Sequence, residues 1–103
     1  LGGRVCDMEG IAKIAKKYNC LVVEDACHAP GAYYNSNNIV GNCKYSIATT
    51  FSHHAIKHIA MGEGGSITLN SFSIMKRIMI SQLFQKSSVN KDYSISGWVR
   101  TKS

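Results

Sequence analysis

The feature that most constrains the fold is a change of hydrophobic period early in the chain. Between residues 8 and 18 apolar side chains recur at helical spacing, with lysines on the opposite side. Asp7 is placed to cap this helix and Asn19 to end it. Residues 20–23 then form a short apolar run that stops at two acids, as expected for a strand covered on both faces. A helix that leads into such a strand indicates α/β architecture.

Turn residues and short apolar runs predict further strands downstream. Pro30-Gly31 and the asparagine-rich residues 35–38 favour turns. Strands are predicted at residues 46–51 and 66–69, on either side of an irregular stretch rich in histidine and glycine.

A second helix is predicted after Ser71 or Ser73, either of which could cap it. Its apolar positions would be Ile74, Met75, Ile78, Met79 and Leu83. Because the periodicity then fades, we expect residues 1–85 to form the folded unit and residues 86–103 to be a divergent, poorly ordered tail. The start at Leu1 favours a piece of a longer gene product.

Length, composition and charge exclude several classes of protein. A chain of 103 residues, 45% hydrophobic and 17% charged, allows one globular domain at most. No apolar run approaches the roughly 18 residues of a membrane helix, and no export signal is apparent, so we expect a cytoplasmic protein without membrane partners. Most of the net charge of +6 comes from basic residues scattered over the C-terminal third, without a nucleic-acid-binding motif, so nucleic acid is not an expected partner.

The cysteines and histidines give no strong metal signal. The four cysteines contain no Cys-x-x-Cys pair, and we expect reduced, mostly buried thiols. His54 and His58 could share a zinc ion on a helix, but the glutamate of His-Glu-x-x-His is absent. A zinc module built from these two histidines with Cys27 and His28 remains a minor alternative to the expectation of no metal.

Two residues are candidates for chemistry on their own. Asp25 follows the first predicted strand, and ligands of open α/β sheets bind beyond the carboxyl ends of strands. It could equally cap a short helix over residues 26–29. Lys57 follows a predicted strand, and a desolvated lysine amine can condense with an aldehyde, although most lysines are solvated surface charges.

The order of these residues along the chain is more specific than any one of them. It runs Glu24-Asp25-Ala26-Cys27-His28-Ala29, Gly41, Phe51-Ser52-x-His54-Ala55-Ile56-Lys57 and Gly62-Glu63-Gly64-Gly65. Over about residues 2–80 this order resembles the DegT/DnrJ/StrS family of nucleotide-sugar aminotransferases. The resemblance implies part of the large domain of a fold-type I enzyme, with a mostly parallel sheet and flanking helices, and pyridoxal phosphate as cofactor.

The resemblance also implies a role for each matched residue. Lys57 would bind the cofactor covalently and transfer protons between the amino donor and the cofactor. Asp25 would pair with the pyridinium nitrogen, His28 would lie beside the phenolic oxygen, and Ser52 would donate to the phosphate. Without the motif order, His28 and Ser52 would be read as capping and turn residues.

The reaction implied by the resemblance is amino transfer, usually from L-glutamate, to a keto-sugar nucleotide. A lysine at position 57 favours transfer over the dehydration of offshoots that carry histidine there. The Met61-Gly62-Glu63-Gly64-Gly65 variant is most similar to the branch on the route to pseudaminic acid, which aminates a UDP-linked 4-keto-6-deoxy-hexosamine. Family members are homodimers whose partner chain completes the site.

The chain departs from the family pattern in two ways. His53 stands where the family usually has phenylalanine, and its polar ring needs a hydrogen-bond partner if it is buried. The phosphate cup and the aromatic residue over the cofactor ring would precede Leu1. We therefore expect the isolated chain to be inactive, and the alternative is a noncatalytic or decaying fragment that keeps the motifs by descent.

Overall fold

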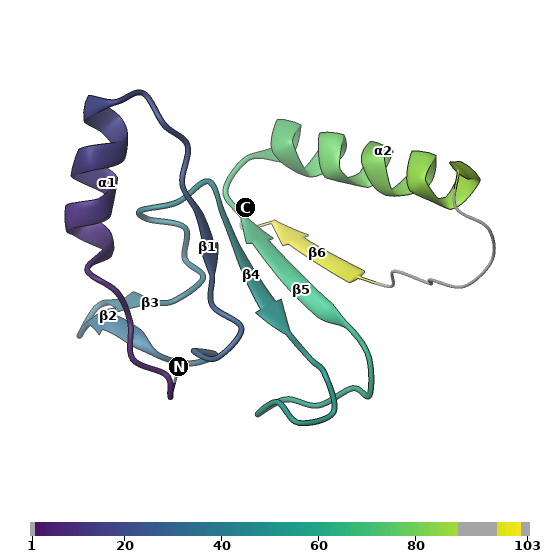
Figure 1. The fold of residues 1–103 in the computed structure, drawn as a ribbon, viewed down its shortest axis with the longest axis horizontal. Helices are drawn as coiled ribbons and strands as arrows, with labels where there is room; N and C mark the ends of the chain where they lie inside the picture. Colours follow the sequence, from purple (N-terminus) through teal and green to yellow (C-terminus); the bar gives the residue numbers. More distant parts are fainter. Residues whose placement is uncertain (1, 89–96, 102–103) are drawn as a thin grey trace.

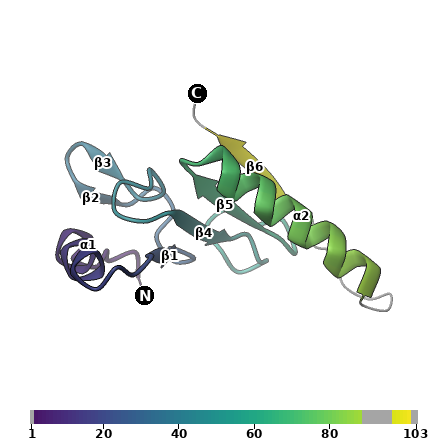
Figure 2. The same ribbon diagram turned by 90° about the horizontal axis from the view of Figure 1, so that it is seen from above.

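A four-stranded sheet lies between two groups of flanking elements (Figure 1). The computed structural model describes residues 2–88 and 97–101, and the side chains of residues 2–81. In chain order the elements are α1 (Met8–Lys17), β1 (Val23–Asp25), β2 (Tyr33–Asn35), β3 (Asn38–Ile39), β4 (Ala48–Ser52), β5 (Gly65–Leu69), α2 (Phe72–Ser88) and β6 (Gly97–Thr101). Figure 2 shows α1 and the β2–β3 hairpin near β1, and α2 at the opposite end, near β6.

The fold is α/β, as expected, and the described sheet is mixed, with two of its three strand pairings parallel. Its order is β1-β4-β5-β6; β1 pairs with β4 and β5 with β6 in parallel, but β4 and β5 are antiparallel. A parallel return would need a long crossover, usually through a helix, whereas residues 53–64 connect β4 to β5 without one. The chain therefore turns back beside the strand that it has just left.

Helix α1 confirms the predicted helix almost to the residue. The Asp7 carboxylate accepts a hydrogen bond from the Gly10 backbone N–H at 3.0 Å, and Asn19 follows the helix in the left-handed region with φ of 53°. Met8 is buried, but Ile14 and Tyr18 are exposed. The helix thus packs through its first turn and leaves much of its apolar stripe uncovered.

Strand β1 differs from its prediction in length and in burial. It begins at Val23 rather than at residue 20, and Leu21 and Val23 are 79% and 60% exposed. The prediction of a strand covered on both faces was therefore wrong for this chain. The apolar run was correctly identified, but among the described residues no element covers the face that carries Val23.

The turns between β1 and β4 form where the sequence places them. Gly31 has a φ of 78° after Pro30, and the Ala32 N–H donates to the Ala29 carbonyl at 3.2 Å, which closes the turn. In the β2–β3 hairpin the Asn35 side-chain oxygen accepts from the Asn37 backbone N–H at 3.2 Å.

Helix α2 begins at the predicted capping serine. The Ser71 hydroxyl accepts from the Ile74 backbone N–H at 3.4 Å. Within residues 86–103, expected to be a poorly ordered tail, α2 continues to Ser88 and β6 pairs with β5 over Gly97–Thr101. Residues 89–96 and 102–103 lie outside the described part of the chain. None of the described helices is both long and apolar enough to cross a membrane.

A small core joins the sheet to the segment before β4. Thr49 is fully buried with its hydroxyl 3.6 Å from the Cys43 thiol, and Ala48, Leu69 and Cys43 are buried as well. The Cys43 thiol donates to the Thr68 carbonyl at 3.2 Å, so this buried polar group is satisfied. All four cysteines are free, as expected, but Cys6 and Cys20 are exposed, so the expectation of mostly buried thiols was wrong.

We predict that Gly41→Ala destabilises the chain by about 3 kcal/mol because it combines backbone strain with a clash. Gly41 has a φ of 90°, and a β-carbon there would lie 2.8 Å from the Phe51 ring. Gly62 has a φ of 78° with open space around it, so Gly62→Ala should cost only about 1 kcal/mol. Urea unfolding followed by circular dichroism measures both, and equal losses would contradict the clash.

Candidate functional site

The candidate site lies at the sheet edge where β1 and β4 end. Because these strands are parallel, their carboxyl ends meet at one edge, and Asp25 is in register with Thr50. Ser52 ends β4, and residues 53–64, called here the lysine loop, carry Lys57 before the chain returns in β5. This is the edge at which open α/β sheets bind ligands.

Asp25 forms a local turn rather than capping a helix. Its Oδ1 accepts from the Cys27 backbone N–H at 3.0 Å, and the Ala29 N–H donates to the Ala26 carbonyl at 2.9 Å. The short helix considered for residues 26–29 is absent from this described segment. Hydrogen bonds from the Cys27 side chain and backbone lower the pKa of Asp25, and the charges of His28 and Lys57 add to the effect. Asp25 is thus kept ionised.

Lys57 and His28 meet across the site although they are far apart in sequence. The Lys57 Nζ lies 3.0 Å from the His28 Nε2, within hydrogen-bond distance. The Lys57 backbone N–H also donates to the His54 carbonyl at 2.8 Å, which turns the lysine loop toward the end of β1. Lys57 is half-buried and His28 is exposed, so the contact is open to solvent on one side.

Ser52 shares this edge but makes a local contact. Its hydroxyl accepts from the His54 backbone N–H at 3.4 Å. Among the described side chains, the recorded hydrogen bonds do not join Ser52 to Asp25, His28 or Lys57. Its assignment to the cofactor phosphate therefore stays a prediction.

Cys27 belongs to the same group, although the sequence suggested only a minor alternative for it, as a zinc ligand. Its hydrogen bond with Asp25 is the main cause that raises the pKa of the Cys27 thiol, and partial burial adds to it. The positive charge of Lys57 acts in the opposite direction. The interaction could have been predicted from the sequence, because Cys27 lies two residues after an aspartate that ends a strand, and an Asx turn at such a position brings the two residues together.

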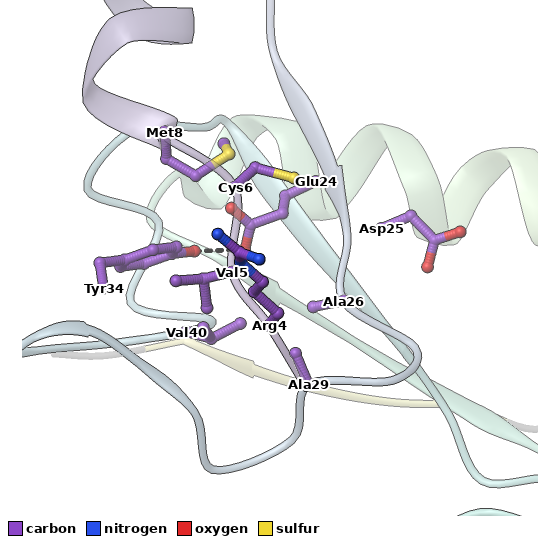
Figure 3. Close-up of a pocket in the computed structure, with 10 residues that line it drawn as sticks. All are labelled: Arg4, Val5, Cys6, Met8, Glu24, Asp25, Ala26, Ala29, Tyr34 and Val40. Carbon is purple, nitrogen blue, oxygen red and sulfur yellow. Dashed lines mark hydrogen bonds between the residues drawn. The ribbon is translucent and has the colours of Figure 1, made fainter. Parts of the chain in front are cut away.

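A small cavity lies beside β1; Asp25 is among the residues that line it, but its side chain points away from the others (Figure 3). It measures about 60 Å³ and is lined by residues that include Arg4, Met8, Glu24 and Tyr34. The Tyr34 hydroxyl donates to the Glu24 Oε1, and burial together with this bond raises the pKa of Tyr34. The Glu24 Oε2 is buried and has no hydrogen-bond partner among the described residues. The two adjacent acids therefore occupy opposite environments.

The histidines of the lysine loop separate instead of converging on a metal. His54 lies 3.7 Å from the Glu63 carboxylate, and the His53 ring contacts Ser66. Within the described side chains, no group of three or more histidine, cysteine or acidic residues is arranged to hold a metal ion.

The chain is similar in sequence to a family of aminotransferases and to several of its named members. The model of the DegT/DnrJ/EryC1/StrS aminotransferase family matches residues 1–97. Over 78% of its length the chain is 38% identical to GDP-perosamine synthase of Caulobacter vibrioides, and over 94% it is 34% identical to the spore coat polysaccharide biosynthesis protein SpsC of Bacillus subtilis. Over 77% it is 34% identical to UDP-4-amino-4,6-dideoxy-N-acetyl-beta-L-altrosamine transaminase of Campylobacter jejuni. The chain spans only 20–25% of the length of these relatives.

We predict that Asp25→Asn accelerates alkylation of Cys27 by iodoacetamide at pH 8 severalfold. Asparagine is a weaker hydrogen-bond acceptor than a carboxylate and carries no charge, so the substitution weakens the main cause of the raised thiol pKa and removes the repulsion of the thiolate by Asp25, and more of the reactive thiolate is present. Mass spectrometry of timed samples measures the rate at each cysteine. The exposed Cys20 should react at the same rate in both proteins, and an unchanged rate at Cys27 would contradict the Asp25–Cys27 interaction.

Proposed function

The chain belongs to the DegT/DnrJ/EryC1/StrS aminotransferase family, and from this premise we propose that it is the cofactor-binding segment of a nucleotide-sugar aminotransferase. The observation that carries the proposal is the 3.0 Å contact between the Lys57 Nζ and the His28 Nε2, at the sheet edge that also holds Asp25. The residues assigned from the motif order thus lie at one edge of the sheet, and two of them are in direct contact.

The donor set at this edge fits pyridoxal phosphate in its chemistry. An ionised carboxylate, an imidazole and an amine are the groups that its ring nitrogen, phenolic oxygen and aldehyde require. When bound, the cofactor supplies an electrophilic aldehyde and an electron-withdrawing ring. Asp25, His28, Ser52 and Lys57 are the residues proposed to hold it.

Each residue has a function that its surroundings support. An amine must lose a proton before it acts as a nucleophile or base. In the tautomer that leaves the His28 Nε2 unprotonated, this nitrogen would be a proton acceptor within reach of the Lys57 Nζ. Asp25, ionised through its bonds to Cys27, would hold a protonated ring nitrogen. Ser52, at the end of β4, would donate a hydrogen bond from its hydroxyl to the phosphate.

The substrates are proposed from the family and from the names of the relatives. A keto-sugar nucleotide would accept the amino group, with L-glutamate as donor, in the synthesis of a surface sugar such as pseudaminic acid. Asp25 and His28 are exposed, and the chain spans a fifth to a quarter of its relatives. We therefore propose that the active enzyme is a cytoplasmic homodimer, that further segments and a partner chain cover the site, and that the isolated chain is inactive.

We predict that pyridoxal phosphate attaches selectively to Lys57. The purified chain is incubated with the cofactor and reduced with borohydride, which fixes a reversibly bound cofactor on its lysine, and is then digested for mass spectrometry. Because a charge-assisted hydrogen bond is worth about 1.5–3 kcal/mol, Asp25→Asn should reduce labelling at Lys57 about tenfold or more. The exposed Lys76 on α2 should label weakly and equally in both proteins.

Even labelling of all lysines would contradict the proposal. It would favour a noncatalytic fragment that has lost cofactor binding.

A further inference from the structure

The first residue of the lysine loop makes hydrogen bonds to both ends of that loop. The His53 backbone N–H donates to the Gly64 carbonyl at 2.8 Å, and the His53 carbonyl accepts from the Met61 N–H at 2.8 Å. The ring reaches two more partners: Nδ1 lies 3.3 Å from the Ile59 carbonyl oxygen, and Nε2 lies 2.9 Å from the Ser66 hydroxyl. One residue therefore joins the start of the loop to its second half and to β5.

The chemistry of the partners fixes the ring's hydrogens. A carbonyl oxygen can only accept, so Nδ1 must carry a hydrogen and donate to Ile59. In the neutral ring Nε2 then accepts from the Ser66 hydroxyl. A phenylalanine ring of similar size would fill the same space and make neither bond. The two hydrogen bonds therefore distinguish His53 from an apolar ring that only fills the same space.

We propose that His53 is a positioning residue that holds the lysine loop closed and thereby keeps the Lys57 Nζ beside His28. Lys57 lies between His53 and Ile59, so the contact of the ring with Ile59 closes the short segment that carries the lysine, and the contact with Ser66 ties that segment to β5. The consequence for amino transfer rests on the proposed function. The restraint on the loop is independent of the proposed function, because it depends only on the hydrogen bonds of His53 within this chain.

The first test is amide hydrogen exchange on the cofactor-free chain, comparing wild type with His53→Phe. Losing the two hydrogen bonds of the ring should speed exchange of the Met61 and Lys57 amides about tenfold. His58→Phe is the matched control, since it makes the same change at an exposed ring of the same loop and should leave these rates within about twofold. Unchanged rates in His53→Phe, or equal acceleration in the amides of β4, would overturn the proposal.

The second test measures Lys57 itself and includes a rescue. In His53→Phe the borohydride-fixed cofactor at Lys57, relative to Lys76, should fall about tenfold. Glutamine offers one N–H donor and one oxygen acceptor, so His53→Gln should recover most of the selectivity. If His53→Phe exchanges faster but labels Lys57 as wild type does, the positioning role is overturned. If wild type itself labels without selectivity, the proposed function fails, and the exchange experiment alone still decides whether His53 holds the loop.

Discussion

The antiparallel ladder between β4 and β5 determines where every candidate residue can lie. Its register runs from Ala48 opposite Leu69 to Ser52 opposite Gly65, and its buried end contains the fully buried Thr49. Because Ser52 and Gly65, which flank the lysine loop, pair with each other, the loop must start and end at neighbouring positions of the sheet. Strand β1 adds to the other side of β4 in parallel and delivers Asp25 to the same edge. Two ladders that share β4 thus bring distant residues together.

The uncovered face of β1 links the folding of the chain to the chemistry of the site. Val23 and Asp25 are both exposed and, because side chains alternate along a strand, point to the same side. A segment or subunit that buried the valine would also exclude water from around Asp25 and Lys57. Their interaction would then strengthen, since charges attract more strongly in a medium of low dielectric constant. Burial of Val23 and a stronger attraction between Asp25 and Lys57 are therefore expected to arise together.

How far the sequence predicts the structure depends on how local each feature is. Helix α1 and its Asp7 cap follow from spacing within a few residues, and the proximity of Asp25, His28 and Lys57 was implied by motif order. No direction was predicted for β5, because its direction depends on the absence of a helix in a glycine-rich connection. The partners of His53 could not be predicted, since Ile59 and Ser66 approach its ring only after the loop has closed.

The pairing of Glu24 with Tyr34 behind β1 has a consequence for how the strand finds its alignment. Moving β1 by one residue along β4 would exchange its two faces, so that Asp25 entered the cavity and Glu24 faced the ligand edge. The aspartate is one methylene shorter and would meet the tyrosine hydroxyl less well, and its turn with Cys27 would be lost. The different lengths of the two adjacent acids therefore favour the observed register of β1 on β4 over the register shifted by one residue.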